Sequence, residues 1–246
     1  MKIEEYGKEN ASTIVMLHGA NFVHCYGRQY PLQSRFHIVV PHIMGFGDEA
    51  DRVFNTEACA AELASFVNGL DKKVLLVGFS LGAQLAFKLV SEYPDMFYSA
   101  ILVSPWLYKT ESSLTEAIEK NKKQLSLLKK KWLCNIIGIM NGLPTTQRRK
   151  FVDQMQEVKL ESICHSIDNG ITFESVPAFA TVSIPMMALA GEKEQQEVID
   201  TVREMAGINP HCRYEVWEKA KHNIPPVFAK KFNQLIVDMA KSELTY

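Results

Sequence analysis

Short apolar runs alternate along the chain with longer segments in which apolar residues recur every three or four positions. The runs are typical of buried β-strands, and the longer segments are typical of amphipathic α-helices. The predicted strands cover Thr13 to Leu17, His37 to Val40, Lys73 to Val77, Ala100 to Val103, Pro185 to Ala190 and Cys212 to Trp217. The clearest predicted helices cover Glu57 to Leu70, Leu81 to Glu92, Gln195 to Ala206 and Pro226 to Met239. Such alternation predicts an α/β fold, with a mostly parallel, doubly wound sheet covered on both faces.

One gap between predicted strands is too long for a single crossover helix. It runs from Ser104 to Ile184, about eighty residues, whereas a βαβ unit needs roughly thirty. We therefore predict one α/β core, formed by residues 1–105 and 176–246, with an insertion at residues 106–175. An insertion at the strand ends is well placed to be a lid.

The insertion has a helical pattern. Ser113 to Glu116 matches a capping box, which predicts the start of a helix. One face of that helix is apolar and is formed by Leu114, Ile118, Leu125, Leu128 and Trp132. Gly142-Leu143-Pro144 interrupts the pattern, after which a second helix begins at Thr145 or Thr146 and a short third helix covers Leu160 to Ile167.

Composition limits the class of protein. Hydrophobic residues make up 47% and charged residues 22% of the 246 positions, which is too apolar for a disordered chain. The 27 basic and 28 acidic residues nearly balance, so nothing indicates nucleic acid as a partner. Met1 to Tyr6 contains acids where a signal peptide would be apolar, and the sequence has no run long enough to span a membrane. We expect a cytoplasmic protein.

The cysteines and the basic residues are less informative. The five cysteines are Cys25, Cys59, Cys134, Cys164 and Cys212. Their odd number argues against a disulfide framework, and no C-x-x-C spacing indicates zinc. The insertion is rich in basic residues, at Lys122, Lys123, Lys129, Lys130, Lys131, Arg148, Arg149 and Lys150. A solvated helix face is the simplest interpretation, and attraction of an anionic substrate, an acidic surface or a protein partner is the alternative.

The pentapeptide Gly78-Phe79-Ser80-Leu81-Gly82 lies between a predicted strand and a predicted helix. This context is typical of a nucleophile elbow, in which a tight turn raises the serine above the sheet edge. The backbone N–H of Leu81 would then point toward a developing oxyanion at the helix N-terminus. Glycines on either side would relieve crowding where the helix and the strand nearly touch.

A base and an acid that could serve Ser80 follow later in the chain. His222 comes after the last predicted strand, so it lies at the same sheet edge as Ser80. The acid is either Glu194 or Glu192, which both follow the strand that ends at Ala190. We favour Glu194, because its carboxylate could accept a hydrogen bond from the imidazole and stabilise the imidazolium.

The first predicted strand ends in His18-Gly19-Ala20-Asn21. This turn could supply a second oxyanion donor through the N–H of Ala20. The small side chain of Ala20 would leave room for a substrate.

Together these motifs resemble the α/β-hydrolase superfamily, in its single-domain, lidded branch of carboxylesterases and carbon–carbon bond hydrolases. The resemblance implies that Ser80 is the nucleophile, that His222 is the base, and that Ala20 and Leu81 form the oxyanion hole. The family's acid is usually an aspartate, whereas this chain has Glu194. Haloalkane dehalogenases and epoxide hydrolases have an aspartate where this chain has Ser80.

We therefore expect a serine hydrolase that cleaves a small carboxylic ester through an acyl-enzyme intermediate, without a metal or an organic cofactor. The same triad would also serve a thioesterase or an acyltransferase. A non-catalytic receptor or interaction module on the same fold is the alternative from another class. The expected partner is a small acyl substrate, and the sequence does not predict the oligomeric state.

Overall fold

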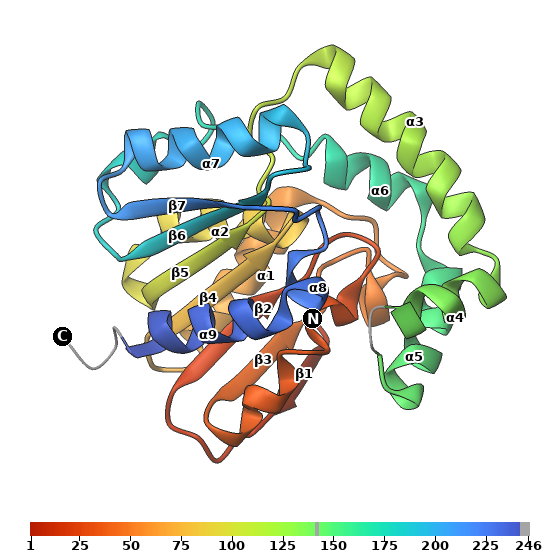
Figure 1. Cartoon of the computed structure of the whole chain (residues 1–246), viewed down its shortest axis with the longest axis horizontal. Helices are drawn as coiled ribbons and strands as arrows, with labels where there is room; N and C mark the ends of the chain where they lie inside the picture. Colours follow the sequence, from red (N-terminus) through yellow and green to blue (C-terminus); the bar gives the residue numbers. More distant parts are fainter. Residues whose placement is uncertain (141–142, 242–246) are drawn as a thin grey trace.

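A seven-stranded sheet forms the centre of the computed structural model, which describes residues 1–140 and 143–241 (Figure 1). Its strands are β1 (Ile3–Tyr6), β2 (Thr13–Leu17), β3 (His37–Pro41), β4 (Val74–Phe79), β5 (Phe97–Val103), β6 (Met186–Gly191) and β7 (Cys212–Trp217). They lie in the order β1-β3-β2-β4-β5-β6-β7, and β1 is antiparallel to β3 while the other pairs are parallel. The predicted mostly parallel sheet is confirmed.

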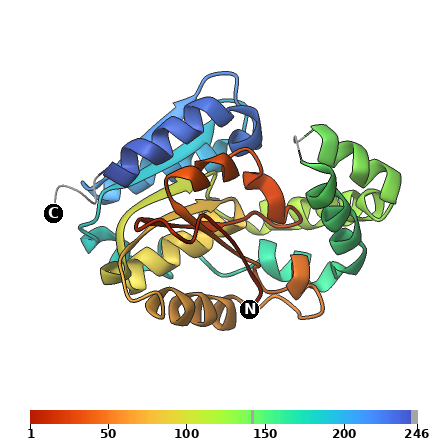
Figure 2. The ribbon, with the colours of Figure 1, turned by 90° about the horizontal axis from the view of Figure 1, so that it is seen from below.

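Helices cover both faces of this sheet. They are α1 (Thr56–Asn68), α2 (Leu81–Glu92), α7 (Gln196–Ile208), α8 (Ile224–Val227) and α9 (Ala229–Ala240). Alternate strand residues point to opposite faces, so Val15 packs in the cluster that includes α1, α2 and α7, and Ile14 packs in the cluster that includes α9. Figure 2 shows α1 and α9 on opposite sides of the sheet. The doubly wound arrangement is therefore confirmed.

Within the described residues, four further α-helices lie between β5 and β6 in the chain. They are α3 (Glu111–Leu128), α4 (Lys131–Met140), α5 (Thr145–Glu157) and α6 (Leu160–Ile167). They gather beyond one end of the sheet in both views (Figure 1, Figure 2). The buried side chains of Leu125, Leu128, Phe151 and Met155 join the hydrophobic cluster that contains α1 and α2. The insertion is thus packed on the core.

Two details of the insertion differ from the sequence-based expectation. The capping residue is Thr110, one turn before Ser113: the Ser113 N–H donates to Thr110 Oγ1 over 3.1 Å, and the Thr110 N–H donates to Ser113 Oγ over 2.9 Å. The first helix also ends at Leu128, so Trp132 belongs to α4 and is exposed. Gly142 of the predicted interruption lies outside the described residues.

Two elements of the core also differ. Strand β1 was not expected, because four residues with two glutamates at a sheet edge leave no clear alternating pattern. The last predicted helix is divided at Phe228 into α8 and α9, where Phe228 has non-helical backbone angles. Neither difference alters the sheet edge at which Ser80 lies.

Candidate active site

Ser80 occupies a strained turn between β4 and α2. Its φ of 55° and ψ of −116° are rare for a residue with a side chain. A Cβ on Gly78 would lie 2.4 Å from the carbonyl oxygen of Gly82, and a Cβ on Gly82 would lie 2.1 Å from that of Leu17. The turn therefore requires both glycines, because the helix and the strands approach too closely for a larger residue.

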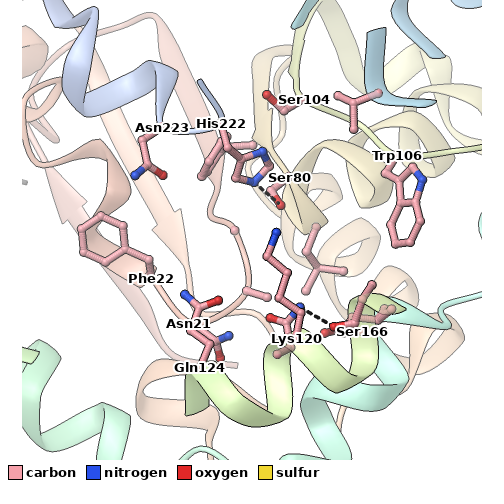
Figure 3. Close-up of a pocket in the computed structure, with 18 of the residues that line it drawn as sticks. Asn21, Phe22, Ser80, Ser104, Trp106, Lys120, Gln124, Ser166, His222 and Asn223 are labelled. Atoms are coloured by element: carbon pink, nitrogen blue, oxygen red, sulfur yellow. Dashed lines mark hydrogen bonds between the residues drawn. The ribbon is translucent and has the colours of Figure 1, made fainter. Parts of the chain in front are cut away.

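The structure brings His222 and Glu194 to this turn from two other loops. His222 Nε2 lies 3.1 Å from Ser80 Oγ (Figure 3). His222 Nδ1 lies 2.7 Å from Glu194 Oε2. A carboxylate can only accept, so Nδ1 carries the proton and donates to Glu194. This leaves Nε2 free to accept the hydroxyl proton of Ser80.

Glu194 is held by two other donors as well. Its Oε1 accepts hydrogen bonds from the Gly191 N–H over 2.9 Å and from Ser104 Oγ over 2.6 Å. Burial by itself raises the pKa of Glu194, but the hydrogen bond and charge of His222, with the bonds from Ser104 and Gly191, hold that pKa below its usual value. The side chain is only 3% exposed. The carboxylate is thus buried, ionised and fixed.

Glu192, the alternative acid, has a different partner. Its Oε2 accepts a hydrogen bond of 2.7 Å from the backbone N–H of Lys219. Lys219 has a φ of 61° and lies in the loop that carries His222. Glu192 therefore fixes the first part of the loop that carries His222, whereas the carboxylate of Glu194 reaches the imidazole.

Ala20 and Leu81 both line the cavity beside Ser80, and the backbone N–H of neither donates a hydrogen bond within the described residues. His18 fixes the turn before Ala20. Its Nδ1 donates to the Gly19 carbonyl over 2.8 Å, and its Nε2 accepts from the Ile43 N–H over 2.9 Å. Burial lowers the pKa of His18 to about 3, so the ring is neutral and can make both bonds.

A cavity of about 520 Å³ opens over Ser80 between the core and the insertion. Its walls include residues from the core loops and residues of α3, α4, α5 and α6. The lining includes Asn21 and Phe22 from the core, Trp106 from the segment between β5 and α3, and Lys120 and Gln124 from α3 (Figure 3). A space of this size suits a small ligand.

The sequence reasoning did not identify Ser104, Lys120 or the role of His18. Ser104 directly follows β5 and has a φ of 54°, so the only available signal was a polar residue at a strand end. Lys120 was one of several lysines on a helix. Its direction toward the cavity depends on how the insertion packs, which the local pattern does not reveal.

The described parts of the chain contain no group of three or more His, Cys, Asp or Glu side chains suited to a metal ion. All five cysteines are free. Among the described helices, none has the length and apolar character needed to cross a bilayer.

Comparison with known proteins identifies the fold. The α/β hydrolase family model matches residues 14–235. No curated protein sequence matches significantly. Similar solved structures include MenH from S. aureus, at 18% identity with a TM-score of 0.71, covering 99% of this chain and 98% of that one. An esterase from Thermogutta terrifontis is 20% identical with a TM-score of 0.69, covering 96% and 91%. A bromoperoxidase from Bacillus anthracis is 16% identical with a TM-score of 0.76, covering 97% and 94%. At such identities these likenesses establish the fold alone.

Proposed function

The chain belongs to the α/β hydrolase family, and from this premise we propose that it is a serine hydrolase that cleaves a small carboxylic ester. The observation that carries the proposal is the line of hydrogen bonds from Ser80 Oγ through His222 to Glu194. It lies at a strained turn beside a cavity, which supports attack by Ser80 on a bound acyl group. The esterase among the similar structures agrees with this proposal.

In the first half of the reaction, Ser80 Oγ attacks the ester carbonyl carbon while His222 Nε2 takes the hydroxyl proton. The carbonyl electron pair moves onto its oxygen, which accepts hydrogen bonds from the N–H groups of Ala20 and Leu81. When this intermediate collapses, the bond to the alcohol oxygen breaks and His222 gives that oxygen the proton. Glu194 remains ionised throughout and stabilises the imidazolium.

In the second half, water attacks the acyl group on Ser80, and His222 takes a proton from the water. Collapse then breaks the bond to Ser80 Oγ, which recovers the proton from His222, and the carboxylic acid leaves. This sequence needs neither a metal nor an organic cofactor.

Residues 106–175 act in this proposal as a lid. Support comes from α3 to α6, which supply part of the cavity wall opposite Ser80. Because the substrate identity then depends on the insertion, the core residues alone do not define it. A cytoplasmic location is also part of the proposal, and the five free cysteines agree with it.

The test is hydrolysis of para-nitrophenyl esters by the purified protein and by Ser80→Ala. We expect the substitution to lower kcat by roughly a thousandfold or more, because the nucleophile is lost. A fluorophosphonate probe should label the wild type and not the variant. Ser91→Ala, on α2 and outside the cavity, is the matched control and should keep activity and labelling. Retained turnover in Ser80→Ala, with an unchanged circular dichroism spectrum, would refute the proposal.

A further inference from the structure

One basic side chain of the insertion turns inward. Lys120 of α3 lines the cavity, and its amine extends toward Ser80 and His222 (Figure 3). Within the described residues it forms no hydrogen bond and no ion pair. Of the Lys and Arg residues in the described insertion, it is the one that borders the cavity.

Neighbouring basic residues have other partners. Lys122 Nζ pairs with Glu119 over 2.7 Å, and Lys150 Nζ pairs with Glu4 over 3.1 Å. Lys129 Nζ donates to the Val158 carbonyl over 2.9 Å. Lys120 is therefore a charge left available on the cavity side of the insertion.

The cavity holds more cations than available anions. Lys193 and Lys221 also line it, while its acidic residues are Glu116 and Glu194. Glu194 is already occupied by three hydrogen bonds. Glu116 lies one helical turn before Lys120, yet the two form no ion pair in the described structure. An anionic ligand would meet a positive field here.

From this arrangement we infer that the substrate carries a carboxylate, which pairs with the ammonium group of Lys120 while the ester carbonyl lies at Ser80. The inference rests on the proposed function. Gln124 follows one turn later on the same helix and lines the cavity, so its amide is a further donor for the carboxylate. Pairing inside a partly closed cavity is stronger than at an open surface.

The experiment compares three esters. Para-nitrophenyl hexanoate is neutral, para-nitrophenyl hydrogen adipate has a carboxylate on its acyl side, and the hexanoyl ester of para-hydroxybenzoate has one on its alcohol side. We expect KM for at least one acidic ester to be about tenfold below that of the neutral ester. Lys120→Gln should raise that KM about tenfold, more than it changes KM for the neutral ester. Lys123→Gln, on the same helix but outside the cavity, should keep the wild-type ratio.

The outcomes separate this inference from the proposed function. If the wild type cleaves none of the esters, the proposed function fails. If it cleaves the neutral ester through Ser80 and shows no preference for either acidic ester, only the carboxylate inference is overturned. A preference that survives in Lys120→Gln would also overturn it.

The outer face of the insertion carries a second, independent feature. On α4, Trp132, Ile136, Ile139 and Met140 are 64%, 42%, 54% and 76% exposed. Their spacing puts them on one side of the helix, opposite the buried Cys134 and Gly138. Four large apolar side chains on one exposed face of a helix are unusual at a surface that contacts only water.

Basic residues flank α4: Lys130 precedes it, Lys131 begins it, and Arg148 Nε of α5 donates to its Asn135 over 2.9 Å. Between Glu119 and Asp153 the sequence has no acidic residue, while nine basic residues occur there: Lys120, Lys122, Lys123, Lys129, Lys130, Lys131, Arg148, Arg149 and Lys150. An exposed apolar helix face with Lys and Arg beside it is typical of a segment that lies in the headgroup region of an anionic bilayer. A second copy of the chain would bring two such cationic surfaces together, which is unfavourable.

We propose that α4 binds an anionic lipid surface, with Trp132, Ile136 and Ile139 entering the headgroup region. The probe is vesicles of phosphatidylcholine, with and without roughly a third phosphatidylserine. The wild type should sediment with the anionic vesicles, and the double variant Trp132→Ser with Ile139→Ser should bind at least about fivefold less. Val227→Ser, which alters an exposed apolar residue of α8, is the control and should bind normally.

Two results would overturn the lipid proposal. One is a wild type that does not bind anionic vesicles, or that binds as well after the double substitution. The other is a wild-type dimer in light scattering that becomes monomeric in the double variant, because a second copy would then cover the face.

Discussion

Two glutamates of one short segment differ in what their carboxylates reach. Glu194 contacts His222 Nδ1, while Glu192 accepts from the backbone N–H of Lys219. Strand β6 ends at Gly191, and Glu192 and Glu194 follow it by one and three residues. The sequence could narrow the acid to this pair, but only the path of the loop after β7 distinguishes them.

The first prediction uses this pair. Glu194→Gln should lower kcat by at least about a hundredfold, because an amide keeps the size but loses the charge that stabilises the imidazolium. Glu192→Gln should change kcat little, since an amide oxygen can still accept from Lys219. The measurement is kcat on a para-nitrophenyl ester for both variants, with the melting temperature as the fold control. A larger loss in Glu192→Gln would assign the acid to Glu192 instead.

A second prediction concerns His18. Its pKa is lowered to about 3 in the folded protein from an ordinary value of 6.5. Between these values the unfolded chain binds a proton that the folded chain does not, so this group lowers stability as pH falls through that window. The expected loss is about 2 kcal/mol at about pH 5 relative to neutral pH.

His18→Gln should therefore reduce the dependence of the unfolding free energy on pH, besides lowering stability at every pH. Urea unfolding at about pH 7 and about pH 5 measures both effects, and the difference between the two pH values is the informative quantity. The same difference in the variant and the wild type would contradict the account of a neutral, buried ring.

At the scale of elements, the turn from β4 to α2 depends on two glycines. Gly82→Ala should destabilise the protein by about 1–3 kcal/mol or more, because the new Cβ would lie 2.1 Å from the Leu17 carbonyl oxygen. Gly207→Ala is the control, because that glycine lies in α7 with nothing within 4 Å of the added atom. It should leave the melting temperature unchanged or raise it. Equal effects of the two substitutions would show that the close approach at Gly82 is relaxed in solution.

The strong apolar runs could be predicted from sequence because buried parallel strands read as continuous hydrophobic segments. Strand β1 could not, because its pairing with β3 is at an edge and its residues are half polar. The boundary between α3 and α4 could not be predicted either, because the segment from Lys129 to Lys131 contains no glycine or proline to mark a helix end.

Some residues of the candidate site could be predicted from the sequence and others could not. Ser80 and His222 have local signals, one in the elbow pentapeptide and one in the position after the last strand. Ser104 and Lys120 have none, because Ser104 donates to Glu194, far away in the chain, and Lys120 lines a cavity that distant segments form together. The position of Lys120 depends on how the insertion packs, and that of Ser104 depends on its positive φ. Neither feature can be predicted from the local pattern of a single sequence.

At the scale of the whole molecule, charge is unevenly divided. Residues 106–175 contain 11 Lys and Arg against 8 Asp and Glu, whereas the remaining residues contain 16 against 20. The insertion is thus net positive and the core net negative, although the whole chain has a net charge of −1. The cavity lies between them, so the field that a substrate meets on approach is set largely by the insertion.

The last prediction follows from this division. The ratio kcat/KM for para-nitrophenyl hydrogen adipate should fall as ionic strength rises, while that for the neutral hexanoate stays nearly flat. Charges more than about 8 Å apart are largely screened at physiological ionic strength, so the difference between the two esters should be clearest at lower ionic strength. Lys130 and Lys131 do not line the cavity, so reversing both to glutamate should weaken the salt dependence without changing kcat. Lys230→Glu, on α9, makes a charge change away from the insertion and should have little effect. Identical salt profiles for the two esters would mean that the basic run is a solvated surface that does not act on the substrate's approach.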